Sequence, residues 1–150
     1  MFVSLSMGPA ICHLLEIPAK MAYDGAFWLH ISQTLYGPRF GSVGAFFEVG
    51  AVVTSIILVF MVRHRKPAFT WAVAGAIFMV AIHASFWIWI APVNAKIAVM
   101  TPETLPTDWT ALRYQWEFTH AARAYLHMIA MAALAISILV ETDNRLYTKN

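Results

Sequence analysis

Six side chains that can exchange protons, hold charges or stack on rings lie close together in the last third of the chain. They are Arg113, Trp116, Glu117, His120, Arg123 and His127. On an α-helix, at about 100° per residue, these positions fall within an arc of roughly 120°, so they share one helix face. An imidazole titrates near neutral pH and can take a proton from a substrate, while a guanidinium can hold the anion that results. The face therefore has the residue types for proton-transfer chemistry.

This polar face runs directly into the apolar segment Met128 to Val140. Ionisable residues that enter a membrane span are costly unless they meet partners or water, so they indicate a functional site. Their partners must come from other helices.

The overall composition indicates a membrane environment. Of the 150 residues, 60% are hydrophobic and only 12% are charged, far from the balance of soluble domains. We expect a single multi-pass membrane domain over residues 1–150, in contact with the lipid bilayer and, in a bacterium, located in the cytoplasmic membrane. The net charge of +2 does not indicate nucleic-acid binding, and the single cysteine, Cys12, excludes an internal disulfide.

Four segments are candidates for membrane-spanning helices. Residues 41–62 and 68–90 are each long enough to cross about 30 Å of hydrocarbon, and residues 116–140 form a third predicted span. Residues 1–17 are apolar but short, and the ring of Pro18 would clash with the carbonyl four residues earlier. Their length also suits a signal peptide, but they lack an initial Lys or Arg and a small-x-small cleavage site. The sequence predicts an all-α, four-helix membrane bundle with a short or kinked first span.

Charges at the turns predict the orientation of these spans. The turn at residues 63–66, RHRK, is strongly positive, and positive residues in short loops mark the cytoplasmic side. The last span returns to that side, where Arg145 and Lys149 follow it. Both termini are therefore predicted to be cytoplasmic.

The two connections on the opposite side have helical signals of their own. Residues 19–36 mix aromatic and polar side chains, which is typical of an interfacial helix and also of the aromatic belt of membrane proteins. We expect an interfacial helix between spans one and two, placed to cover a pocket. In the second connection, Pro92 to Asn94 are expected to end the third span, and Thr107 or Asp108 to cap the final helix.

Ionisable residues from four helices are predicted to lie at one depth. At 1.5 Å per residue, Glu48 and His83 each lie about 10 Å from the outer end of their span. Glu16 lies close to the outer end of the first span, and His120 and Arg123 fall in the outer part of the last. This convergence predicts a polar pocket at, or just below, the outer surface.

These residues also have a purely structural interpretation. Glu48 requires a cation at this depth, and an ion pair with Arg123 or Arg113 could serve only to fix helix packing. His83 could be a hydrogen-bonded histidine of the bundle interior.

The first span adds a smaller polar set. His13, Glu16 and Lys20 share one helix face, at spacings of three and four residues. We expect the Lys20 ammonium to extend toward the lipid headgroups, which leaves His13 and Glu16 as the informative pair.

Four sequence patterns together resemble a known family. They are C-H-L-L-E-I-P-x-K at residues 12–20, Q-x-x-Y at 33–36, P-V-N at 92–94 and D-W-x-x-x-R-x-x-W-x-x-x-H-x-x-R at 108–123. Over nearly its whole length the chain resembles the small four-helix membrane proteins grouped with the anthrone oxygenases. The resemblance implies a four-helix membrane fold. It also implies oxidation of an anthrone to an anthraquinone by molecular oxygen, without a metal or flavin cofactor.

That reaction requires a base for an acidic C–H group and a cation for the resulting enolate. His120 is the expected base, and Arg123 or Arg113 the expected enolate partner. Glu48 or Glu16 would orient the histidine, and tryptophan rings would stack on a flat hydrophobic substrate. Substrate contacts are expected from the side chains of Asn94, Trp109, Trp116, His13, Glu16 and His83.

Two other classes of function stay open. His120 with His83 or His13 could bind haem or copper across the bundle, although neighbouring arginines disfavour a cationic metal. A non-catalytic accessory subunit of a membrane complex, or a small transporter, is the second class. Small residues at positions 41, 44, 45, 50 and 51 would also allow close contact with another helix or with a second copy of the chain.

Overall fold

The computed structural model describes residues 1–147, and every regular element in that range is helical. In chain order the elements are α1 (Phe2–Ala22), α2 (Gly25–Ile31), η1 (Ser32–Phe40), α3 (Gly41–Val62), α4 (Lys66–Ser85), η2 (Phe86–Ile90), α5 (Ala91–Val99), η3 (Pro102–Thr104) and α6 (Trp109–Tyr147). The elements η1 and η2 are π-helical segments, and η3 is a short 3-10 turn.

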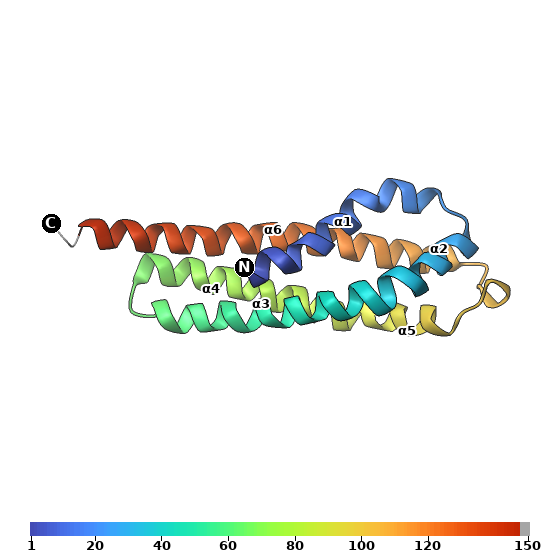
Figure 1. Ribbon diagram of the computed structural model, residues 1–150, viewed down its shortest axis with the longest axis horizontal. Coiled ribbons are helices and arrows are strands. Elements are labelled where there is room, and N and C mark those ends of the chain that lie inside the picture. Colours follow the sequence, from blue (N-terminus) through green and yellow to red (C-terminus); the bar gives the residue numbers. More distant parts are fainter. Residues whose placement is uncertain (148–150) are drawn as a thin grey trace.

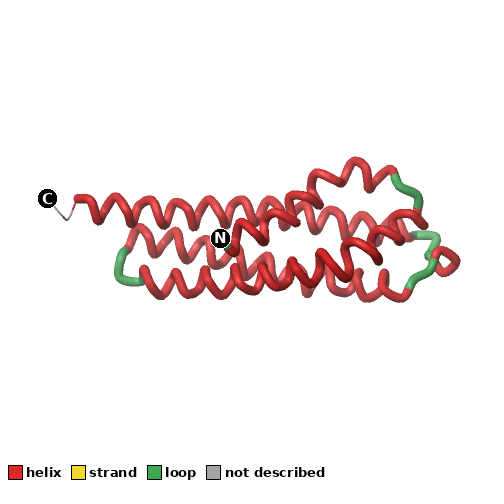
Figure 2. Tube along the Cα trace, viewed as in Figure 1, coloured by secondary structure: helices red, strands yellow, loops and turns green. Residues whose placement is uncertain are grey.

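Four helical segments are long and apolar enough to cross a membrane, namely Phe2–Ala22, Gly41–Val62, Lys66–Val99 and Trp109–Glu141. Helix α1 packs on α3 and α6, and α4 packs on the same two helices, which closes a four-helix bundle. The helices run along the long axis of the molecule (Figure 1). Figure 2 shows the turn between α3 and α4 at one end and the other loops at the opposite end. The all-α four-helix architecture is thus confirmed. Lys149 lies outside the described residues, and the cytoplasmic placement of the termini stays a prediction.

The first helix is longer than the sequence predicts. Helix α1 has 21 residues and contains both Pro9 and Pro18, so the expected end at Pro18 is wrong. A proline inside a helix removes one hydrogen bond and bends the axis, which a packed bundle can tolerate. Helix α1 is bent (Figure 1), and it ends where Tyr23 becomes extended.

The third span also continues past its expected end. Pro92 lies in the first turn of α5, and the helix runs on to Val99. The π-helical turn η2 comes directly before α5, and the N–H of Ala91 donates to the carbonyl of Phe86, five residues back. The hydrogen-bond ladder is already shifted at this point, so the missing N–H of Pro92 falls where a helix start tolerates it. The final helix begins at Trp109, directly after Asp108, as the sequence predicts.

The helix expected within residues 19–36 is present, but it is joined to the second span. Helix α2 begins after Asp24, whose Oδ1 accepts a hydrogen bond from the Phe27 N–H at 2.8 Å. Residues 25–62 are then helical without interruption, through α2, η1 and α3. The position of this helix relative to a membrane interface stays a prediction.

Apolar clusters pack at two levels and leave a polar layer between them. The cluster near the α2 end contains Trp28, Tyr36 and Trp116, while the central one contains Met79 and Leu134. Along α6, the residues between these clusters include the histidines and Arg123 of the polar face. A cavity lies in this layer.

Candidate functional site

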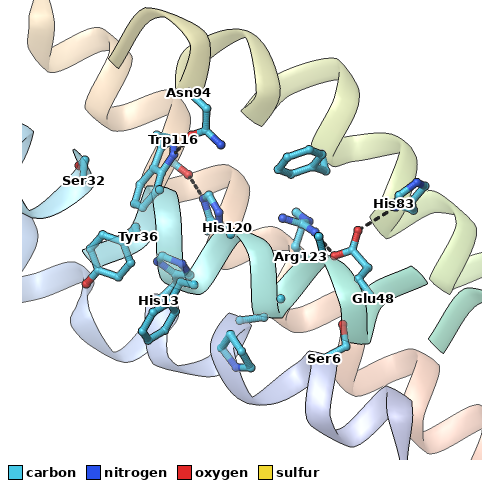
Figure 3. Close-up of a pocket in the computed structure, with 18 of the residues that line it drawn as sticks. Ser6, His13, Ser32, Tyr36, Glu48, His83, Asn94, Trp116, His120 and Arg123 are labelled. Carbon is cyan, nitrogen blue, oxygen red and sulfur yellow. Dashed lines mark hydrogen bonds and ion pairs between the residues drawn. The ribbon is translucent and has the colours of Figure 1, made fainter. Parts of the chain in front are cut away.

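A cavity of about 670 Å³ lies between the helices in the polar layer. Its wall is built from α1, η1, α3, α4, η2, α5 and α6, so almost every long element contributes. The cavity is lined by these predicted site residues (Figure 3): His13, Glu48, His83, Asn94, Trp116, His120 and Arg123. The structure therefore brings together residues that are more than 100 positions apart in the sequence. Its volume suits a ligand of several fused rings.

Arg113 does not line this cavity, although the sequence made it a candidate. Its Nη1 donates hydrogen bonds to the carbonyl oxygens of Lys20 at 3.2 Å and Tyr23 at 2.7 Å. Its guanidinium also lies 4.5 Å from the ring centroid of Trp109. Arg113 thus donates to backbone carbonyls at the C-terminal end of α1, and its role is to fix α1 against α6.

Trp109 and Glu16 are likewise outside the cavity wall. The ring of Trp109 packs on Trp28, with centroids 5.8 Å apart, and so cannot stack on a ligand in the cavity. Glu16 Oε2 accepts a hydrogen bond from the hydroxyl of Tyr36 at 2.5 Å. Burial and this bond to Glu16 raise the pKa of the Tyr36 phenol. Tyr36 lines the cavity, but its hydroxyl is committed to Glu16 rather than to a ligand.

Glu48 joins three helices at the floor of the cavity. It accepts a hydrogen bond from Arg123 Nη2, which identifies Arg123 rather than Arg113 as its cation. His83 Nδ1 lies 3.0 Å from Glu48 Oε1, and Trp87 Nε1 donates to His83 Nε2 at 3.1 Å. Because an indole nitrogen can only donate, His83 must carry its proton on Nδ1 and give that hydrogen bond to Glu48. The Arg123 guanidinium is buried, and its Nε has no hydrogen-bond partner among the described residues.

His120 is held by the backbone of its own helix. Its Nδ1 lies 2.8 Å from the carbonyl oxygen of Trp116. A carbonyl can only accept, so the proton is on Nδ1 and the lone pair of a neutral His120 is on Nε2. The expected orienting role of Glu48 or Glu16 is therefore wrong, because the Trp116 carbonyl orients this ring.

His127 lies two helical turns after His120 on α6, and its Nδ1 is also bound to a backbone carbonyl of the same helix. Unlike His120, its second ring nitrogen also has a partner. Its Nδ1 donates to the carbonyl of Arg123 at 2.8 Å, and its Nε2 lies 3.0 Å from the hydroxyl of Ser6. The hydroxyl of Ser6 is therefore the donor, and the His127 lone pair is occupied. No such contact from the described residues reaches Nε2 of His120, which is the unoccupied acceptor of the two.

Lys20 is buried instead of reaching the headgroups, which corrects the expectation from the sequence. Only 2% of its surface is exposed, and its Nζ lies 2.7 Å from Glu117 Oε2 and 3.1 Å from His13 Nδ1. Trp28 Nε1 donates to the other carboxylate oxygen of Glu117 at 3.2 Å. A charged ammonium can only donate, so Nδ1 of His13 accepts and its proton is on Nε2.

His13 therefore pairs with Lys20 and not with Glu16. Sequence reasoning placed Lys20 and Glu117 on the correct helix faces but did not assign them to the site. The signal that could have found them was their charge, since two opposite charges at matching depth on neighbouring helices need each other.

The rings of His13 and His120 are in contact in the cavity wall, tilted by 38° to each other. Their centroids are 4.3 Å apart, and Trp116 packs on both, with centroids 5.0 Å and 4.3 Å away. Asn94 Oδ1 accepts a hydrogen bond from Trp116 Nε1 at 2.8 Å, which fixes the indole. The cavity wall thus holds, in two neighbouring rings (Figure 3), the acceptor Nε2 of His120 and the donor Nε2–H of His13.

The same geometry bears on the haem and copper alternative. Both ring nitrogens of His83 are engaged, and the His13 and His120 rings are in contact, which leaves no room for a porphyrin between them. Within residues 1–147, no three His, Cys, Asp or Glu side chains are placed to hold one metal ion.

Fold and site together define a four-helix bundle whose long helices are apolar enough to span a membrane, with a polar, aromatic-lined cavity between them. Compared with protein-family models, curated proteins and solved structures, the chain has no significant match.

Proposed function

We propose that this protein is a membrane oxygenase in which His120 acts as a base on a flat, hydrophobic aromatic substrate of the anthrone class. The observation that carries the proposal is the tautomer of His120. Its Nδ1–H is committed to the Trp116 carbonyl, which leaves the Nε2 lone pair directed at a cavity large enough for a fused ring system. A general base must reach the proton that it removes. The Nε2 lone pair of His120 lies in the cavity wall and is free to accept that proton.

Three side chains supply the groups that the enolate requires. Arg123 is the cation nearest to His120 on the same helix face, and its unpartnered Nε can donate to a substrate oxygen. Its charge is balanced by Glu48, so the empty site holds a neutral pair instead of an isolated buried charge. The Nε2–H of His13 can donate to the same or a neighbouring oxygen.

The proposed reaction is balanced with molecular oxygen as the only oxidant. His120 removes one proton from the substrate methylene, and the resulting enolate is oxidised as a carbon–oxygen bond forms to O₂. The peroxide anion takes the proton back from His120. Loss of the second C–H proton, with cleavage of the O–O bond, gives the ketone and hydroxide, which combines with that proton to form water. One anthrone and one O₂ thus give one anthraquinone and one water.

Oxygen consumption by the purified protein tests this proposal. With anthrone as substrate, we expect protein-dependent uptake of O₂ that matches the anthraquinone formed, and a rate lowered by about 10²–10⁴ in His120→Gln, the range for loss of a general base. Glu103→Gln, a change at an exposed residue of η3, is the matched control and should be as active as the wild type. An uptake no faster than that of anthrone without protein would overturn the proposal.

A further inference from the structure

The cavity has an opening on the side of the bundle. Several of its lining residues are also exposed on the molecular surface. Gly37, Gly41 and Ala45 lie along one edge of the opening, and Trp87, Asn94 and Ala98 lie along the other. We call the gap between these two edges the window. Apart from Asn94, whose Oδ1 accepts a hydrogen bond from Trp116 Nε1, the side chains at these edges are apolar or absent.

Hydrogen bonds close the window at both ends. Toward the loops, Gln33 Nε2 donates to the carbonyl oxygens of Ile97 and Met100, each at 2.8 Å, and ties η1 to α5. At the other end, the bond from His83 to Glu48 joins α4 to α3. These two bridges are 15 residues apart along the η1–α3 helix, or about 22 Å at 1.5 Å per residue. The window is therefore a slit parallel to the helices and not a mouth at the end of the bundle.

The surface around the window is suited to lipid. Gly41 and Ala45 belong to the candidate span Gly41–Val62, and Trp87 belongs to the span Lys66–Val99. Trp87 is 62% exposed, and the neighbouring Ile88 is 57% exposed, with no charged residue between Phe86 and Asn94. Side chains of this kind at span depth face hydrocarbon, because water would make their exposure costly.

We propose that the cavity is loaded sideways from the bilayer through the window, and that its ligand is a membrane-dissolved amphiphile. A flat polar ring system would reach His13 and His120, and an apolar part would lie in the window against Gly41 and Ala45. Gly44 supports this, because a Cβ placed there would meet no atom within 4 Å, so the wall beside it is open. The inference rests on the cavity being the binding site of the proposed function, but not on the oxidation step.

Two probes with different routes of access test the window. One is anthraquinone attached to the end of an acyl chain of phosphatidylcholine, which can reach the cavity only through lipid. The other is anthraquinone-2-sulfonate, which stays in water. Binding is measured by saturable quenching of tryptophan fluorescence in lipid nanodiscs. We expect the lipid-attached probe to bind and the sulfonate to bind at least about tenfold more weakly.

Substitutions at the window edge provide the second measurement. Ala45→Phe should weaken binding of the lipid-attached probe by about tenfold or more, because the ring fills the gap. Gly44→Leu is a second variant, in case Ala45→Phe does not fold. Val43→Phe is the matched control, since Val43 is on the same helix, is 55% exposed and does not line the cavity. Val43→Phe should bind the probe as the wild type does. Collisional quenching by the probe in the lipid is the same in all variants, so differences between variants report binding in the cavity.

The outcomes separate this inference from the proposed function. Equal or tighter binding of the sulfonate, or unchanged binding in both edge variants, would overturn lateral loading. Binding of the lipid-attached probe without oxygen uptake from anthrone would leave the window intact and overturn only the oxidation. If neither probe bound, both lateral loading and the proposed function would be overturned.

Discussion

Lys20 of α1 and Glu117 of α6 form an ion pair of 2.7 Å in which the two side chains are 2% and 0% exposed. The pair fixes the second half of α1 on α6. Since Lys20 also donates to His13, the same contact sets the tautomer of His13 and its position against His120. The positioning of the site thus depends on a pair of charges outside the cavity wall.

Removing one member of this pair should destabilise the protein more than removing both. We expect Lys20→Met to lower the free energy of unfolding by about 3–5 kcal/mol, because it leaves the Glu117 carboxylate buried without a cation. The double variant Lys20→Met/Glu117→Leu should recover most of the loss. Thermal unfolding in detergent, followed by circular dichroism, measures this, with Lys96→Met at an exposed position as the control. A double variant as unstable as Lys20→Met would contradict the pairing.

The two arginines of the α6 face should differ in the property that they affect. Arg113→Lys loses the two hydrogen bonds to the carbonyls of Lys20 and Tyr23, so we expect about 1–3 kcal/mol less stability and a normal rate for the folded fraction. Arg123→Lys keeps the charge beside Glu48 but loses the planar Nε donor, so we expect a lower rate of oxygen uptake from anthrone. Unfolding and turnover measured on the same preparations distinguish them. A normal rate in Arg123→Lys would remove Arg123 from the proposed chemistry.

The raised pKa of Tyr36 predicts how stability depends on pH. The folded protein favours the neutral phenol, so this stabilisation is complete below about pH 10, where the unfolded phenol ionises, and is lost as the pH rises further. Tyr36→Phe lacks both this titration and the bond to Glu16. We expect the wild type to be more stable than Tyr36→Phe by about 1–3 kcal/mol at pH 8 and the difference to shrink above pH 10. Tyr114→Phe, at a position that is 52% exposed, should show no such trend.

The purified protein should show no haem absorption, because among residues 1–147 no pair of cavity histidines is placed to ligate a porphyrin. His83 uses both ring nitrogens within the protein, and His13 packs directly on His120. An absorption spectrum, with metal analysis of the same sample, tests this. A Soret band or a stoichiometric metal would contradict the cofactor-free mechanism.

Much of the fold was predictable because hydropathy and length are properties of single segments. The bounds of the segment 41–62 were predicted to the residue, and the convergence of Glu48, His83 and His120 on one cavity followed from counting along helices. Helix ends at Pro18 and Pro92 were predicted wrongly, since the rules for proline describe an isolated helix and not one held by a bundle or preceded by a π-helical turn.

The sequence predicted which residues gather in the site better than it predicted which of them pair with each other. The rotation of each helix about its axis decides whether Glu48 meets Arg113 or Arg123, and that rotation comes from packing across the whole bundle. The burial of Lys20 could not be predicted from α1 alone, because the carboxylate that neutralises its charge, that of Glu117, is on α6. The π-helical segments that line the cavity have no signal in the sequence.

The most direct test of the central claim is deuterium loss from anthrone deuterated at its methylene, measured in ordinary water without oxygen. This isolates proton removal from oxidation. We expect the wild-type protein to accelerate the exchange and His120→Gln to reduce the acceleration by about 10²–10⁴, with Glu103→Gln unaffected. Exchange at the wild-type rate in a folded His120→Gln protein would show that His120 is not the base and would contradict the account.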